Sequence, residues 1–167
     1  MCMNASEKSQ GPSLNSKITD FSIVLITILG AIKGIIGMSW IWKADFESAF
    51  KQILLAPEYF HLVALLIAGF VFIDNTIAMG LRNSTQIFEK FVQALLRGLI
   101  ARHPDIFSRT KELLRLIFNY LDDVWGVAKT RKFATKQFEI FQEWCTFIGV
   151  LKPSKPATSP RTSWVLG

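Results

Sequence analysis

Two adjacent carboxylates, Asp122 and Asp123, interrupt an apolar stretch of the sequence. Apolar runs at 116–118 and 124–128 flank them, and short β-branched and aromatic runs broken by Asp-Asp predict a β-hairpin with the acids at or beside its turn. Neighbouring carboxylates at a hairpin tip repel each other, and a hard divalent cation bound through oxygen ligands relieves this repulsion. A solvated turn is the alternative, because turns favour aspartate. The pair by itself leaves both interpretations open.

Further segments of the sequence, taken in their order, help to decide between a metal site and a solvated turn. Tyr120-Leu121-Asp122-Asp123 has the form of the Tyr-x-Asp-Asp sequence of reverse transcriptases, and residues 43–52 resemble the segment that supplies their first metal-binding aspartate. Residues 79–88 resemble the segment that lies under the template and the incoming nucleotide. Residues 152–155 and 164–167 resemble the closing lysine and Leu-Gly segments. The resemblance covers roughly residues 20–167 and is closest to the retrotransposon type, with a partial copy of the enzyme expected.

The resemblance implies template-directed DNA synthesis, in which a nucleotidyl group passes from a deoxynucleoside triphosphate to a primer 3′-hydroxyl. It implies two Mg²⁺ ions, or Mn²⁺ in their place, about 3.5–4 Å apart. Asp45 and Asp122 are then the main metal ligands, with Asp123 supporting them. Lys155 would lie near the triphosphate and protonate the pyrophosphate leaving group. The implied partners are an RNA or DNA template with its primer, deoxynucleoside triphosphates, and other domains of the element's polyprotein.

The resemblance also implies contacts to nucleotide and template. Phe50, five residues after Asp45, matches the bulky residue beneath the sugar that excludes a 2′-hydroxyl. The other positions implied to contact nucleotide or template are Gly80, Leu81, Arg82, Ser84 and Tyr120. Taken without the family, Asp45 is typical of a helix N-cap and Phe50 of core packing.

The loop at residues 78–85 departs from the family pattern. Family members have proline at the positions of Ala78 and Thr85, and Phe or Gln where Met79 stands. Losing both prolines loosens a loop whose rigidity positions the nucleotide. A catalytically inactive palm remnant with weak nucleic-acid binding is therefore the alternative function.

Two amphipathic helices are predicted to back the hairpin. The first spans 84–101; its apolar stripe is Phe88, Phe91, Leu95 and Leu99, and largely off that stripe lie Glu89, Lys90, Gln93 and Arg97. The second spans 131–148 and stops at Gly149; its apolar face is Ala134, Phe138, Phe141, Cys145 and Ile148. Both stripes have the spacing of core positions.

The elements that lead to Asp45 and to the loop at 78–85 are less regular in sequence. A helix is predicted from Asp20 to about Leu29, followed by a loop and a strand over 38–45. Two strands, 62–66 and 70–77, are predicted to join at Ala68-Gly69 and to close against the sheet.

Composition limits the class of protein. The chain has 167 residues, half of them hydrophobic, which suits one domain with a sizeable core. A net charge of +6 favours an anionic partner, nucleic acid first. The basic residues between Arg97 and Arg115 suit either a solvated face or a track for phosphates. Cys2 and Cys145 have no disulfide-framework spacing, which indicates a reducing, intracellular location in cytoplasm or nucleus.

Apolar runs at 21–42 and 62–73 leave a small membrane protein as a further alternative. A spanning helix needs about 20 apolar residues, and Lys33 at the middle of the first run would cost about 2.5–3.5 kcal/mol. No membrane is therefore expected as a partner.

The predicted fold is α+β: a polymerase palm whose antiparallel sheet carries the three aspartates and is backed by helices, with incomplete fingers and no thumb. Residues 1–17 are predicted to be a disordered polar leader, and residues 18–167 a truncated reverse transcriptase-like palm.

Overall fold

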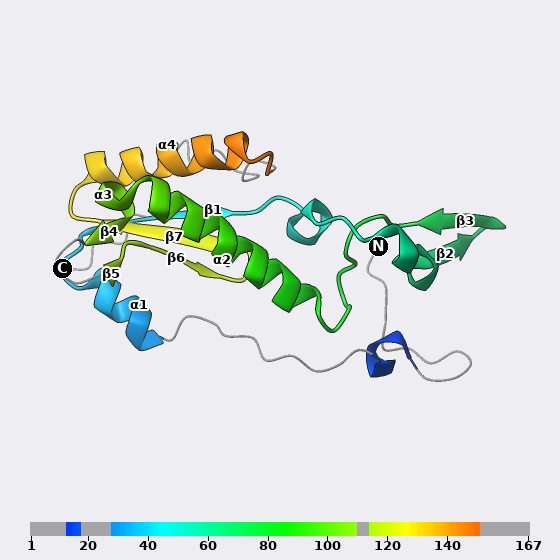
Figure 1. Cartoon of the computed structure of the whole chain (residues 1–167). Coiled ribbons are helices and arrows are strands. Elements are labelled where there is room, and N and C mark those ends of the chain that lie inside the picture. Colours follow the sequence, from blue (N-terminus) through cyan, green and yellow to red (C-terminus); the bar gives the residue numbers. More distant parts are fainter. Residues whose placement is uncertain (1–12, 18–27, 110–113, 151–167) are drawn as a thin grey trace. The chain divides into compact units, whose positions relative to one another are not determined.

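The computed structural model describes residues 13–17, 28–109 and 114–150 (Figure 1). Contacts divide the chain into two compact units. One unit combines Met1–Ile23 with Ser48–Phe88, and the other combines Val24–Glu47 with Glu89–Gly167. Helices and antiparallel strands occur together in the second unit, so the predicted α+β class is confirmed.

The second unit is built on a three-stranded antiparallel sheet with the order β1-β7-β6. Its strands are β1 (Trp40–Asp45), β6 (Ile117–Tyr120) and β7 (Asp123–Ala128). The predicted hairpin is therefore confirmed as β6 and β7, and the strand predicted over 38–45 as β1. The central strand β7 pairs with β6 from Ile117↔Gly126 to Tyr120↔Asp123, and with β1 along its whole length.

Two helices lie on one face of this sheet, which we call the back face (Figure 1). They are α2 (Ser84–Arg102), which belongs to this unit from Glu89 onward, and α4 (Arg131–Phe147). The Trp42 ring of β1 packs against Phe138 and Phe141 of α4, with ring centroids 5.5 and 5.4 Å apart. Both predicted helices are confirmed to within one residue at their ends.

Trp42 lies over its register partner Gly126. A Cβ at Gly126 would come within 2.4 Å of the indole, so only glycine leaves room for the ring between the strand and α4. This close approach explains the glycine in the middle of a buried strand.

The opposite face of the sheet, the front face, packs against the helix α1 (Ile28–Ile35). The apolar cluster there consists of Met38, Leu116, Phe118 and Val127, with Ile35, Ile41 and Trp125 against it. We predicted a helix that ends near Leu29; residues 20–27 lie outside the described residues, and 30–35 are helical instead of a loop. A Cβ at Gly34 would lie 2.2 Å from the Phe118 ring, so this glycine serves close helix packing rather than chain reversal.

Shorter elements connect α2 to the hairpin. The short helix α3 (Pro104–Phe107) follows α2 directly. The strands β4 (Ser108–Arg109) and β5 (Leu114–Arg115) form a separate two-stranded sheet.

At its C-terminal end α4 stops before Gly149, which has φ +76° as a helix-terminating glycine requires. Cys145 is buried on this helix, and burial raises the pKa of its thiol to about 12. Ile148 was predicted to be on the apolar face, but it caps the helix and is exposed. The buried stripe therefore ends at Cys145, since the helix ends at Phe147, before the next position of the stripe.

The other unit contains short elements. They are the 3₁₀ turns η1 (Leu14–Lys17), η2 (Ala49–Gln52) and η3 (Pro57–Leu62), and the strands β2 (Ala64–Ile67) and β3 (Phe70–Ile73). Residues 14–17, predicted to be part of a disordered leader, form η1. The predicted hairpin is present as β2 and β3, which form a two-stranded sheet of their own, and 62–63 and 74–77 are not strand.

Among the described residues, no helix is both long and apolar enough to cross a membrane.

Candidate functional site

The β6–β7 hairpin turns through Leu121 and Asp122. Leu121 has φ +55°, the sign that two-residue hairpin turns require at their first central position. For a residue other than glycine this conformation costs about 1–2 kcal/mol. The hairpin accepts this cost because pairing on both sides of β7 fixes where the turn falls.

All three predicted metal-binding aspartates lie at this end of the sheet. Asp45, the last residue of β1, is the register partner of Asp123, the first residue of β7. Residues directly opposite in an antiparallel pair share a face, so both carboxylates belong to the front face. Asp122 is exposed in the turn, and its carbonyl oxygen accepts a hydrogen bond from Phe46 N at 3.4 Å. The sheet therefore brings together Asp45 and Asp123, which are 78 positions apart in the chain.

Tyr120 completes this row. It is the register partner of Asp123 on β6, so Asp45, Asp123 and Tyr120 stand side by side across the three strands. Its side chain is exposed, which leaves the ring accessible beside the aspartates.

The Asp123 carboxylate pairs with a lysine from the neighbouring strand. Lys43 Nζ lies 2.8 Å from Asp123 Oδ2, and the two side chains are 59% and 37% exposed. Such an exposed pair contributes about 0–1 kcal/mol, so it is readily exchanged for another cation. Among the described residues, no three His, Cys, Asp or Glu side chains are already arranged to hold a metal ion. The backbone register and the hard oxygen donors fit a divalent cation, whereas the Asp123 side chain is turned toward Lys43.

Helix α4 fixes β1 from the back face. Gln137 is fully buried; its Oε1 accepts from Trp42 Nε1 at 3.1 Å, and its Nε2 donates to the Ile106 carbonyl oxygen at 3.0 Å. Both polar ends of this buried amide are therefore satisfied. The contact anchors the strand three residues before Asp45.

Helix α2 fixes β6 in a similar way. Asn119 Nδ2 donates to Glu89 Oε2 at 2.8 Å, and Gln93 Nε2 donates to Glu89 Oε1 at 2.9 Å. We predicted Glu89 to be largely off the apolar stripe, but it is 3% exposed. The signal that could have indicated this burial is Asn119, a polar residue inside an apolar strand, because a buried amide needs a partner.

The residues predicted to contact nucleotide and template, Tyr120 excepted, lie in the other unit. Phe50 follows Ser48, which adopts a left-handed conformation (φ 50°, ψ 43°), and its ring packs against Phe88 with centroids 5.5 Å apart. Phe50 is half-buried, so part of the ring remains accessible.

The loop at 78–84 is held by hydrogen bonds rather than by prolines. Asn15 Nδ2 donates to the Gly80 carbonyl oxygen at 3.0 Å, and Arg82 N donates to Asn15 Oδ1 at 2.8 Å. Ser84 is buried and donates through Oγ to the Ala78 carbonyl oxygen at 2.7 Å. Leu81 is half-buried between these anchored positions. These bonds restrict the loop, which contains no proline.

The predicted site residue Lys155 and the two closing segments cannot be placed beside the aspartates. Lys155 and the closing segments at 152–155 and 164–167 lie outside the described residues.

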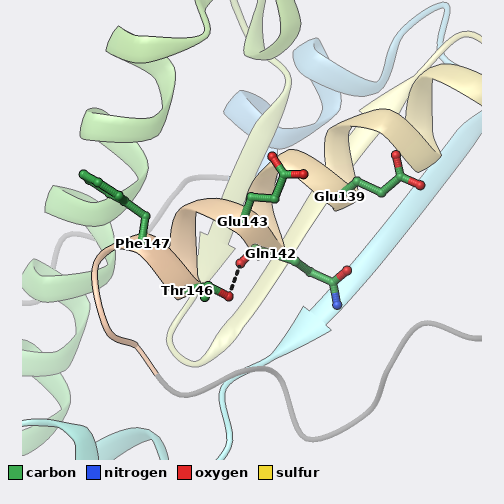
Figure 2. A pocket seen from close by; sticks show the side chains of 5 residues that line it. All are labelled: Glu139, Gln142, Glu143, Thr146 and Phe147. Carbon is green, nitrogen blue, oxygen red and sulfur yellow. Dashed lines mark hydrogen bonds between the residues drawn. The ribbon is translucent and has the colours of Figure 1, made fainter.

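An open pocket of about 490 Å³ lies along α4 (Figure 2). Its lining residues are Glu139, Gln142, Glu143, Thr146 and Phe147. Two carboxylates repel a triphosphate, and no predicted site residue lines the pocket. It is therefore not a nucleotide site.

Comparison with known families decides the assignment of the chain. The family model described as reverse transcriptase (RNA-dependent DNA polymerase) matches residues 3–160. The chain belongs to the reverse transcriptase family. Family membership implies DNA synthesis by nucleotidyl transfer, with a primed nucleic-acid template and deoxynucleoside triphosphates as substrates. No curated protein matches the sequence.

Proposed function

We propose that this reverse transcriptase chain is a polymerase palm that extends a primer by two-metal-ion nucleotidyl transfer. The observation that carries the proposal is the register pair Asp45↔Asp123 beside the exposed turn residue Asp122. Three carboxylates at one end of one sheet are the donor set that hard divalent cations require.

In this proposal Asp45 and Asp122 would hold two Mg²⁺ ions, for which Mn²⁺ could substitute, and Asp123 would support them. The bound cations would supply Lewis-acid stabilisation of the attacking and leaving oxygens. The primer 3′-oxygen attacks the α-phosphorus, and the bond to pyrophosphate breaks. Lys155 would donate a proton to the departing pyrophosphate. Lys43 would release Asp123 because its exposed ion pair is weak.

Most of the residues proposed to select the substrate belong to the unit that contains Ser48–Phe88. Phe50 would exclude a 2′-hydroxyl and so select deoxynucleotides. The anchored loop with Gly80, Leu81, Arg82 and Ser84, together with Tyr120, would contact nucleotide and template. We assign the palm to residues 18–167, its origin to a retrotransposon-type element, and its location to the cytoplasm or nucleus. Other domains of the element's polyprotein would be its partners.

Primer extension by the purified chain tests the proposal, on an RNA template and on a DNA template with Mg²⁺ and deoxynucleoside triphosphates. We expect extension, and we expect Asp122→Asn to reduce it by more than about 100-fold, since loss of an outer-shell partner already costs 10–100-fold. The matched control is Asp105→Asn, an exposed aspartate on α3. Absence of extension by a folded chain would refute the enzymatic proposal.

A catalytically inactive palm that binds nucleic acid weakly is the second candidate. The Lys43–Asp123 ion pair favours it, because a built-in cation occupies one of the carboxylates. The replacement of the two family prolines by Ala78 and Thr85 favours it as well. This candidate predicts no extension in the same assay, but salt-sensitive binding of a primed template.

A further inference from the structure

A buried carboxylate lies on the back face of the sheet, next to the strand that leads into the aspartate hairpin. Glu89 on α2 is 3% exposed, and each of its carboxylate oxygens accepts a hydrogen bond from an amide side chain. A buried carboxylate is costly unless it is hydrogen-bonded, and the hydrogen bond from Asn119 crosses from the helix to the strand at 2.8 Å. This contact therefore resists any movement that separates α2 from β6.

The position of Asn119 connects this contact to the catalytic end of the sheet. One row of register partners on the back face consists of Asn119, Val124 and Ala44. The next row of partners is Tyr120, Asp123 and Asp45, on the front face. Asn119 also precedes the strained turn at Leu121 by two residues, so the strand is anchored immediately before the chain reverses.

We propose that Glu89 is a positioning residue for the aspartate hairpin. By accepting the Asn119 hydrogen bond, it sets the position of β6 on α2 and thereby the position of Tyr120, Asp122 and Asp123. This inference rests on the proposed function for its catalytic consequence, whereas the mechanical link between Glu89 and the hairpin is independent of activity.

The hydrogen bond has a direction, and the direction provides the test. The acceptor is on α2 and the donor is on β6. Asn119→Asp places a second carboxylate against Glu89 at nearly unchanged volume, and two acceptors repel each other. Glu89→Gln combined with Asn119→Asp reverses donor and acceptor and restores one hydrogen bond. A role in filling space alone would not distinguish these variants.

Hydrogen exchange of the amides at residues 120–124 is the first readout. We expect Asn119→Asp to accelerate exchange there by about tenfold or more, because a hydrogen bond to a charged group is lost. We expect the reversed pair Glu89→Gln/Asn119→Asp to return to within about threefold of the wild-type rate. Val92→Ala is the control: it removes buried volume from the same helix and leaves the hydrogen bond in place.

The inference is overturned if the reversed pair exchanges as fast as Asn119→Asp, or if Val92→Ala at equal global stability accelerates these amides as much. Should Asn119→Asp fail to fold, the reversed pair decides alone: folding with wild-type protection supports the inference, and failure to fold overturns it.

The Mg²⁺ concentration for half-maximal primer extension is the second readout. We expect Asn119→Asp to raise it and the reversed pair to restore it, because displaced aspartates hold cations less well. An unchanged Mg²⁺ requirement would overturn the catalytic part of the inference. If the wild-type chain gives no extension, the proposed function fails by itself, and hydrogen exchange still decides whether Glu89 holds the hairpin.

Discussion

The described part of the chain contains two hairpins with two-residue turns, and they differ in what surrounds them. In β6–β7 the strand residues from Ile117 to Asn119 are buried, and the exposed positions are polar or beside the turn. In β2–β3 all but one of the strand residues are exposed, including Leu66 at 74% and Phe70 at 70%. A hairpin pattern in sequence therefore does not reveal whether its apolar side chains are buried.

The turns differ as well. Ala68 and Gly69 both have positive φ, as a type I′ turn requires; glycine adopts this conformation freely, whereas Ala68 bears the same kind of cost as Leu121. Leu121 has positive φ without the freedom of glycine, so its turn depends on the strands around it. Glycine therefore supports one position of the β2–β3 turn, whereas the β6–β7 turn has no glycine and relies on its sheet and helices.

Removing an aromatic ring should give the largest difference between the two hairpins in the free energy of unfolding. Phe141→Ala, beneath the sheet that carries β6–β7, should lower the free energy of unfolding by about 3–5 kcal/mol. Phe70→Ala in β3 should change it by about 0.5 kcal/mol or less, as is usual for exposed positions. Urea unfolding monitored by tryptophan fluorescence measures the effect of Phe141→Ala. The unit that contains Phe141 also contains Trp40, Trp42, Trp125 and Trp144. Similar losses for both variants would show that β2–β3 is buried in solution.

Substitutions in the two turns should change stability by a smaller amount, with opposite sign in the two hairpins. Leu121→Gly relieves the positive-φ cost and should stabilise its unit by up to about 1 kcal/mol. Gly69→Ala introduces the same cost at φ +81°, where a Cβ meets no atom within 4 Å, and should destabilise the β2–β3 hairpin by about 1 kcal/mol. Thermal unfolding tests the first variant, and amide exchange within β2–β3 tests the second. Destabilisation by Leu121→Gly would contradict the strain argument.

The smallest predicted effect concerns the end of β3. The hydrogen bond from Lys51 lowers the pKa of Asp74, with a further contribution from the Thr76 hydroxyl. A lowered folded-state pKa means that this stabilisation is present above the ordinary pKa of aspartate and is lost as the pH falls through the folded value. The pair is partly exposed, so the effect should stay below about 1 kcal/mol.

Carboxyl-carbon NMR titration measures this pKa directly. Lys51→Met should move the pKa of Asp74 upward toward its ordinary value. An unchanged titration would show that Lys51 does not act on Asp74 in solution.

Local sequence was sufficient for the elements whose own residues specify them. Helix α2 and helix α4 follow from an apolar stripe at helical spacing, and the hairpins follow from apolar runs broken at Ala68-Gly69 and at Asp122-Asp123. The order of the motifs also indicated the family that the family model confirms. These features are local because helix and turn formation depend on neighbouring residues.

The tertiary structure decided what depends on contacts between distant residues. It placed Asp45 opposite Asp123 in the strand register, and it formed the ion pair between Lys43 and the Asp123 carboxylate. It also buried Glu89, which periodicity had placed off the apolar stripe, because Asn119 arrives from β6 to satisfy it. The extension of α1 to Ile35 likewise depends on the fit of Gly34 against Phe118. The sequence by itself determined which residues could do chemistry, whereas strand register and helix packing decided which of them meet, because both bring together atoms that are far apart along the chain.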